Sequence, residues 1–153
     1  MSDDVAQEGK RVEERLTEDL LEELLKTERP EDYLLHEVLV DETLPGYLNE
    51  LLVERGISRA AVGRASGITS AFLYELFAGK SAPRRDTAIM LAFGLDCTLK
   101  EAQRLLKLAG LSELWPRRHR DAVIIWCIDR GMSRVECDDE LYRLGEEPLF
   151  KEE

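Results

Sequence analysis

The sequence lacks any segment from which a membrane span, an export signal or a disulfide framework could be built. No apolar run approaches the ~20 residues that a transmembrane helix needs. The first residues, Met1-Ser2-Asp3-Asp4, have none of the basic and apolar character of a signal segment. The three cysteines, Cys97, Cys127 and Cys137, are an odd number at spacings that fit neither paired disulfides nor a zinc clip. We therefore expect a cytoplasmic protein in a reducing compartment, with no membrane contact.

Residues grouped for catalysis or for metal binding are also missing from the sequence. His36 and His119 are isolated, and there is no paired-histidine metal motif, nucleophile elbow or phosphate-binding glycine loop. The consecutive acids Asp138, Asp139 and Glu140 point in different directions around a helix, so they do not converge on one ion. We expect no enzymatic activity, no metal and no cofactor.

Positive charge is scarce overall, but it is concentrated in one part of the chain. The formal net charge is -11 over 153 residues. Residues 1–43 hold 15 Asp/Glu and 5 Lys/Arg, and residues 136–153 hold 8 and 2, whereas residues 44–135 hold 9 and 14. Because affinity for DNA rests largely on neutralising phosphates, this distribution matters more than the sum. An acidic chain contains a basic centre of net +5 between two acidic ends.

Apolar residues recur at helical spacing almost everywhere, and no segment alternates strictly, so the pattern predicts an all-α fold. Residues 1–43 are expected to form an acidic helical segment. Its apolar stripe consists of Val12, Leu16, Leu20, Leu21, Leu24 and Leu25. Arg29-Pro30 should end this helix, and a short one should cover Asp32 to Leu39. The leucine stripe docks either on its own domain or on a partner.

Residues 44–110 are expected to form a five-helix bundle, and residues 111–153 a C-terminal helical extension. The extension contains the strongly apolar run Ala122 to Ile128. We expect this run to be core, with Trp126 covering the neighbouring bundle; a dimer seam is the alternative.

Residues that typically end or cap helices recur at regular intervals between Leu44 and Leu95. Gly56-Ile57-Ser58 should end one helix and cap the next, which runs to about Ala65. Gly67-Ile68-Thr69 should form a tight turn into a helix that ends at Ala78, before Gly79-Lys80 and Pro83. Taken alone, such a corner also fits an ordinary helical hairpin.

These motifs together make residues 44 to about 109 resemble the lambda-repressor-like, Xre-type helix-turn-helix DNA-binding domain. The resemblance implies a recognition helix at about residues 69–78 that enters the major groove of double-stranded DNA, commonly as a homodimer. The chain departs from the family pattern at three positions, with Arg59 in place of the common Gln, Gly63 in place of Ala, and Phe77 in place of Glu.

Helical spacing predicts which side chains would face DNA. Leu73, Leu76 and Phe77 should point inward. The expected base-facing residues are Thr69, Ser70, Ala71, Tyr74 and Glu75, and the expected phosphate contacts are Arg59, Arg64, Lys80, Arg84 and Arg85. The alternative for the basic residues is an ordinary solvated surface. A second cluster, Arg117, Arg118 and Arg120 around His119, is a candidate anion site for DNA phosphate or for the acidic N-terminal segment, or else a solvated loop.

The sequence thus favours a helix-turn-helix transcriptional regulator that binds DNA as a dimer. The alternative is a protein-interaction adaptor on the same scaffold, with weak or no DNA binding. In that alternative the acidic N-terminal helix binds a partner protein or inhibits the DNA-binding surface. The overall acidity and a recognition face without Arg, Asn or Gln motivate this second hypothesis.

Overall fold

The computed structural model describes residues 18–36 and 42–151, and it divides the chain into the units Met1–Asp41 and Glu42–Glu153. In the first unit, residues 18–26 are helical and α2 spans Pro30–His36. Pro30 begins α2, which suits a residue without a backbone N–H. The leucines Leu20, Leu21, Leu24 and Leu25 are 36–74% exposed. Val12, Leu16 and Leu39, also predicted to be helical, lie outside the described residues.

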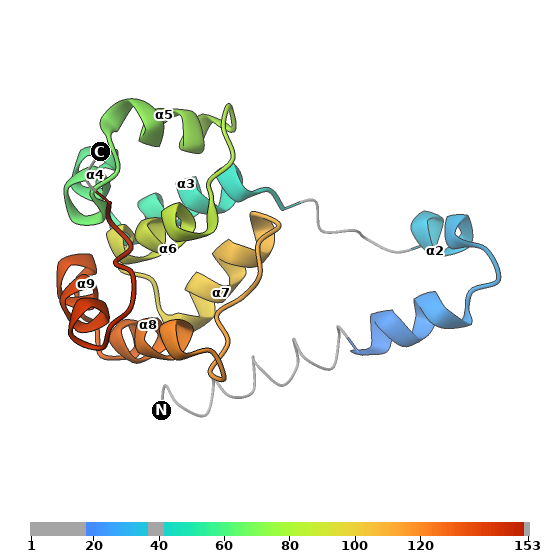
Figure 1. Cartoon of the computed structure of the whole chain (residues 1–153). Helices are drawn as coiled ribbons and strands as arrows, with labels where there is room; N and C mark the ends of the chain where they lie inside the picture. The colour runs from blue at the N-terminus through green and yellow to red at the C-terminus, as the bar shows by residue number, and fades with distance from the viewer. Residues whose placement is uncertain (1–17, 37–41, 152–153) are drawn as a thin grey trace, which may run out of the picture. The chain divides into compact units, whose positions relative to one another are not determined.

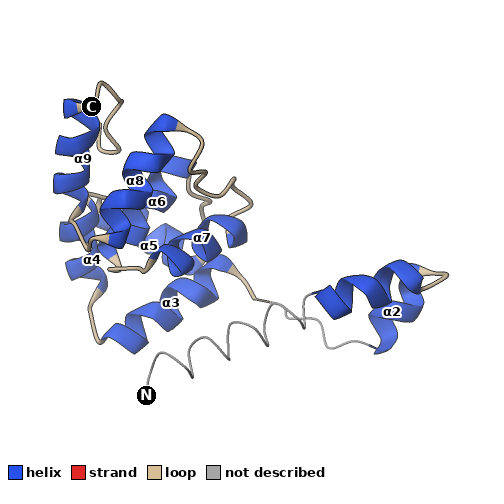
Figure 2. Ribbon diagram, turned by 90° about the horizontal axis from the view of Figure 1, so that it is seen from below, coloured by secondary structure: helices blue, strands red, loops and turns tan. Residues whose placement is uncertain are grey.

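The second unit is a bundle of short helices. They are α3 (Leu44–Arg55), α4 (Arg59–Ser66), α5 (Ser70–Ala78), α6 (Arg85–Gly94), α7 (Leu99–Leu108), α8 (His119–Asp129) and α9 (Arg134–Arg143). Every regular element in the described residues is a helix (Figures 1 and 2). The all-α prediction is therefore confirmed. The predicted division of this unit at residue 110 stays a prediction.

The helices begin and end at the capping residues and glycines that the sequence predicted. Ser58 and Thr69 occupy extended N-cap positions, where their hydroxyls accept hydrogen bonds from the Ala61 and Phe72 backbone N–H groups. Gly56, Gly67 and Gly79 end the preceding helices with φ values of 61°, 86° and 75°. Only glycine adopts this left-handed conformation without steric cost, so these three residues fix where the chain turns.

Helix α6 occupies the centre of the bundle and contacts α4, α7 and α9. Its Ala88 and Leu91 are fully buried, and Ile89 is 1% exposed. At its end, Gly94 lets α4 approach closely, because a Cβ there would lie 2.9 Å from both the Val62 carbonyl oxygen and the Ser66 Cβ. The helix-turn-helix is thereby packed directly onto the central helix.

Two glycines in this region should respond oppositely to substitution by alanine. Gly94→Ala places a methyl group against backbone and should lower the free energy of unfolding by about 2 kcal/mol. Gly63→Ala should raise it by about 0.5–1 kcal/mol, because its Cβ would meet Ile68 O at 3.5 Å and Leu73 Cδ2 at 3.7 Å, both ordinary contacts. Urea unfolding of the two variants measures the difference, and equal effects would contradict this packing.

The C-terminal extension packs on the same unit. Ile124 and Cys127 are fully buried and Ile128 is 7% exposed, so this part of the apolar run is core, as predicted. Trp126 differs from the prediction: it is 44% exposed and lies under Arg130, whose guanidinium carbon is 4.2 Å from the ring centroid. Burial raises the pKa of the Cys97 thiol to about 12 and also raises that of Cys127, so both stay protonated at neutral pH.

No helix in the described ranges is long and apolar enough to cross a membrane.

Candidate nucleic-acid interface

Helices α4 and α5 meet at a turn that is fixed by its own hydrogen bonds. The buried Ser66 hydroxyl accepts a hydrogen bond from the Ile68 backbone N–H at 3.1 Å. The Gly67 backbone N–H donates to the Gly63 carbonyl at 2.9 Å. Thr69 then caps α5. These contacts set the relative direction of two short helices with few residues between them.

Helix α5 has the predicted inner and outer faces. Leu73, Leu76 and Phe77 are 1–5% exposed and belong to the core. Ala71, Tyr74, Glu75 and Ala78 are exposed. The far end of the helix is held by Asn49 of α3, whose side-chain amide donates to the Phe77 carbonyl at 3.1 Å. The outer face of α5 is therefore presented to solvent by a rigidly held helix.

Tyr74 is the centre of a small cationic cluster on that outer face. The side chain is 49% exposed. The Arg59 guanidinium carbon lies 5.4 Å, and the Lys80 Nζ 5.1 Å, from its ring centroid. Both distances are within the range of cation–π attraction. Beside this cluster, the Ser81 hydroxyl donates to Glu75 Oε2 at 2.8 Å, which holds that carboxylate toward the end of the helix.

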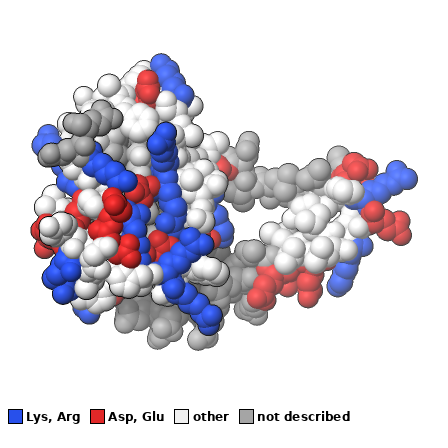
Figure 3. Space-filling model, viewed as in Figure 1, with Lys and Arg blue, Asp and Glu red and all other residues white. Residues whose placement is uncertain are grey.

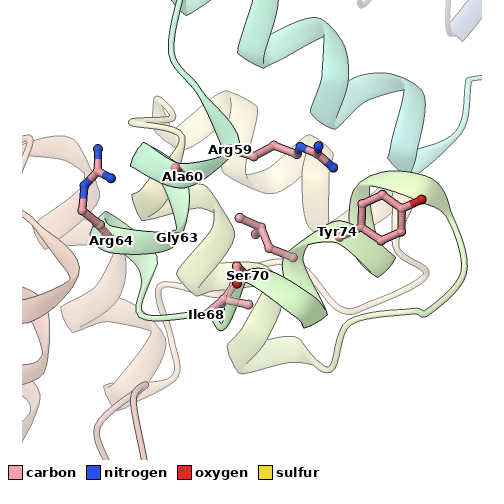
Figure 4. A pocket seen from close by; sticks show the side chains of 8 residues that line it. Arg59, Ala60, Gly63, Arg64, Ile68, Ser70 and Tyr74 are labelled. Atoms are coloured by element: carbon pink, nitrogen blue, oxygen red, sulfur yellow. The ribbon is translucent and has the colours of Figure 1, made fainter.

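A surface hollow of about 470 Å³ separates the exposed sides of α4 and α5. Its lining is mostly apolar and includes Ala60, Gly63, Ile68 and Leu73. Figure 4 shows Arg59 reaching toward the Tyr74 side of the hollow and Arg64 lying at its opposite edge. The two arginines are thus spaced apart along α4, one at each edge.

Two of the predicted contact residues are instead used inside the protein. Arg85 binds Asp121 through both terminal nitrogens, at 3.0 and 2.8 Å, and also donates to the Ser112 and Glu113 carbonyls. Arg120 binds both carboxylate oxygens of Asp86, at 2.8 and 3.0 Å. This interaction raises the pKa of the Arg120 guanidinium. Each of these two arginines thus connects α6 with α8, and their contact with DNA or another anion stays a prediction.

The rest of the second basic cluster is at the surface. Arg117 and Arg118 are exposed, and the Arg118 guanidinium carbon lies 5.7 Å from the Trp115 ring centroid. His119 Nδ1 is 2.6 Å from Glu146 Oε1. Within the described ranges, Arg117 and Arg118 form no ion pair with an acidic side chain, and the Arg118 charge helps to lower the pKa of Asp121.

Many of the basic residues between residues 44 and 135 form ion pairs with acidic side chains of the same chain. Basic residues paired with Asp or Glu are Arg55, Arg85, Arg104, Lys107, Arg120 and Arg134. On the face drawn in Figure 3, acidic side chains accordingly lie next to basic ones. Within the described ranges, no acidic side chain forms an ion pair with Arg59, Arg64, Lys80 or Arg84. These four cations lie around α4, α5 and the start of α6, and their positive charge is not neutralised by an acidic side chain in the described ranges.

Residues 47–109 match the family model of the Cro/C1-type HTH DNA-binding domain. This segment is a Cro/C1-type helix-turn-helix domain. The match includes the turn at Gly67, the outer face of α5 and the unpaired cations around it. Comparisons with curated proteins and with solved structures gave no match.

The match to a Cro/C1-type DNA-binding domain supports DNA binding by residues 47–109 in general terms. In the portion of the chain that the structure describes, no group of three or more His, Cys, Asp or Glu side chains is placed to hold a metal ion. The contacts that the sequence did not predict are the Tyr74 cluster and the ion pairs of Arg85 and Arg120. No local sequence pattern indicates these contacts, because the residues that form them are between six and 36 positions apart.

Proposed function

We propose that the protein is a transcriptional regulator whose helix α5 enters the major groove of duplex DNA. The observation that carries this proposal is the exposed cluster of Arg59, Tyr74 and Lys80 beside a helix start that presents Ser70 and Ala71. Arg59, Arg64, Lys80 and Arg84 neutralise phosphates on either side of the groove. Thr69 and Ser70 lie at the start of the helix that reads the bases.

Base reading by α5 rests on a small set of side chains. The Ala71 methyl group suits contact with a thymine methyl, and the Tyr74 hydroxyl suits a phosphate. Glu75 is bound to Ser81, so its acceptance of a cytosine amino group requires that bond to be shared or broken. The exposed face has no Arg, Asn or Gln for bidentate readout. Specificity then depends strongly on DNA shape and on the spacing of half-sites.

The half-site spacing follows from dimerisation, which is part of the proposal. In a symmetric dimer the two α5 helices lie about one DNA turn apart, ~34 Å, and the operator is correspondingly palindromic. Sedimentation of the full chain with and without an operator duplex measures the stoichiometry. One chain per palindromic site at saturation would contradict the dimer.

Direct binding tests the central proposal. The full chain is titrated with a random-sequence duplex at 50 and 200 mM salt, followed by selection of preferred sequences from a randomised pool. We expect the chain to bind the duplex, and we expect the logarithm of its association constant to fall linearly with the logarithm of the salt concentration. Absence of binding at 50 mM, also after removal of residues 1–41, would refute the regulator.

The exposed pair Arg117 and Arg118 is predicted to contribute additional phosphate contacts. Reversal of both charges to glutamate should lower DNA affinity and reduce the slope of the salt dependence by about 2, because two contacts are lost. The matched control reverses Arg130, which lies on the Trp126 ring, and Arg143, which pairs with Glu140. Unchanged affinity and slope in the first variant would exclude phosphate binding by this pair.

The exposed leucines of residues 18–26 favour a second role, contact with a partner protein. Four leucines on a helix that also carries Glu18, Asp19, Glu22 and Glu23 form an apolar face with an acidic border. The same helix, bound to basic surfaces of its own chain, would act as an inhibitor of DNA binding. DNA affinity that rises after removal of residues 1–41 supports inhibition, whereas unchanged affinity leaves partner binding as its role.

A further inference from the structure

We propose that the C-terminal segment, residues 146–150, holds the helix-turn-helix in its DNA-binding geometry, with Phe150 as the positioning residue. This inference rests on the proposed function, because it concerns how well the α4–α5 surface binds DNA. Figure 1 shows the end of the chain running from α9 back to α4. The segment thus returns to the DNA-binding motif from the opposite end of the unit.

The Phe150 ring packs on the turn between α4 and α5. A Cβ at Gly67 would lie 3.0 Å from Phe150 Cδ2 and 3.3 Å from Cε2, so the ring occupies the space that a side chain there would need. The Arg134 guanidinium carbon lies 4.7 Å from the centroid of the same ring. Phe150 is therefore held between a cation from α9 and the glycine that makes the turn.

Asp138 fixes the backbone that carries this ring. Its carboxylate accepts hydrogen bonds from the Leu149 N–H at 2.6 Å and from the Phe150 N–H at 3.3 Å. It also pairs with Arg134 at 2.5 Å, so one carboxylate holds both the ring and the cation that covers it. The Leu149 side chain is 3% exposed and belongs to the core. The segment has side-chain and backbone anchors on the same helix.

Helix α8 supplies a second set of anchors. Arg120 donates to the Glu147 carbonyl at 3.0 Å and to the Pro148 carbonyl at 3.3 Å, while its other contacts are to Asp86 of α6. His119 contacts Glu146. The C-terminal segment is thereby connected to the central helix α6, onto which α4 is also packed. Phe150 and the motif share one rigid support.

The turn is where such support has the greatest effect on DNA binding. Arg59 and Arg64 lie on α4, whereas Ser70 and Tyr74 lie on α5, so simultaneous contact with DNA depends on the angle between the two helices. The turn between them contains a glycine at φ 86°, a residue that readily adopts other conformations. A ring packed on this glycine restricts its other backbone conformations. Without the ring, the DNA contacts of α4 and those of α5 are no longer held in a fixed relative position.

The test replaces Phe150 in the full chain and measures DNA binding over a range of salt concentrations. Phe150→Ala should lower the affinity about tenfold and reduce the salt slope by about 1. Phe150→Tyr, which keeps the ring, should restore both values. The matched control is Tyr142→Ala, an aromatic truncation on α9 at a side chain that is 82% exposed. Affinity in Phe150→Ala that equals or exceeds the original, or an equal loss in Tyr142→Ala, would overturn the proposal.

Amide hydrogen exchange without DNA separates this proposal from the proposed function. In Phe150→Ala we expect faster exchange confined to Gly67, Ile68 and the first turn of α5, with no change in Tyr142→Ala. This expectation holds even if the original chain binds no DNA, an outcome that would refute the regulator alone. Unchanged exchange at the turn overturns the positioning role. Exchange that rises throughout residues 42–151 also overturns it, because Phe150 would then contribute only general stability.

Discussion

Replacement of Asp121 by alanine is expected to destabilise residues 42–151 by about 3 kcal/mol, which corresponds to about 10 °C in the unfolding midpoint. The Asp121 side chain is 4% exposed and accepts hydrogen bonds from Arg85 and from the Trp115 backbone N–H. Its removal leaves the Arg85 guanidinium without its counter-charge. The effect should lie at the lower end for buried pairs, because Arg85 is itself 25% exposed and water reaches it.

The matched control for this prediction is Asp129→Ala, at an exposed position on the same helix. It should change the free energy of unfolding by less than about 0.5 kcal/mol. Asp121→Asn, which keeps the volume, should behave like the alanine variant because the lost charge is the cause. Denaturant unfolding of the three variants decides the matter, and similar stabilities for Asp121→Ala and Asp129→Ala would contradict an important role for the ion pair.

The contribution of the Arg85–Asp121 ion pair to the free energy of unfolding should depend on pH in the acidic range. Burial alone raises the pKa of Asp121, but the hydrogen bonds from Arg85 and from the Trp115 N–H outweigh it and leave the pKa below its ordinary value. A carboxyl group with a lowered folded-state pKa stabilises the fold above its unfolded pKa of about 3.9, and this stabilisation disappears as the pH falls through the folded-state value. The stability difference between the original chain and Asp121→Asn should therefore shrink below about pH 4.

The fold was predictable from the sequence because the ends of its helices are set by residues at those ends. Gly56, Gly67 and Gly79 all adopt the left-handed conformation, and Ser58 and Thr69 cap the helices that follow them. Each of these signals acts within four residues, so no knowledge of the tertiary structure is needed to interpret it.

The functional surface was only partly predictable, because a basic residue in a sequence does not reveal its partner. Arg84 and Arg85 are adjacent, yet Arg84 is exposed whereas Arg85 binds a carboxylate 36 positions away. The packing of Phe150 on Gly67 joins residues that are far apart in the sequence, and it carries no periodic signal. Internal pairing therefore reduces the basic centre to a smaller set of cations, four of which lie around α4, α5 and the start of α6.

Neutralisation of those cations should have the largest effect on DNA binding. The variant carries Arg59→Gln, Arg64→Gln, Lys80→Gln and Arg84→Gln, four exposed residues without an ion pair in the described part of the chain. If each cation neutralises one phosphate, the slope of log affinity against log salt should become shallower by about 3 to 4. Affinity near 150 mM salt should fall by about two orders of magnitude or more. Fluorescence anisotropy over a salt series measures both quantities.

A second variant separates the location of these charges from their number. It replaces Lys100, Lys107, Arg130 and Arg143 by glutamine, which changes the net charge equally at positions on α7, α9 and the end of α8. Lys107 and Arg143 belong to exposed ion pairs, which contribute little to stability, so the fold should tolerate the change. The control should retain most of the salt slope, because the number of phosphate contacts is unchanged. Equal losses in both variants would mean that DNA is attracted by overall charge, and α5 would then have no special place in the groove.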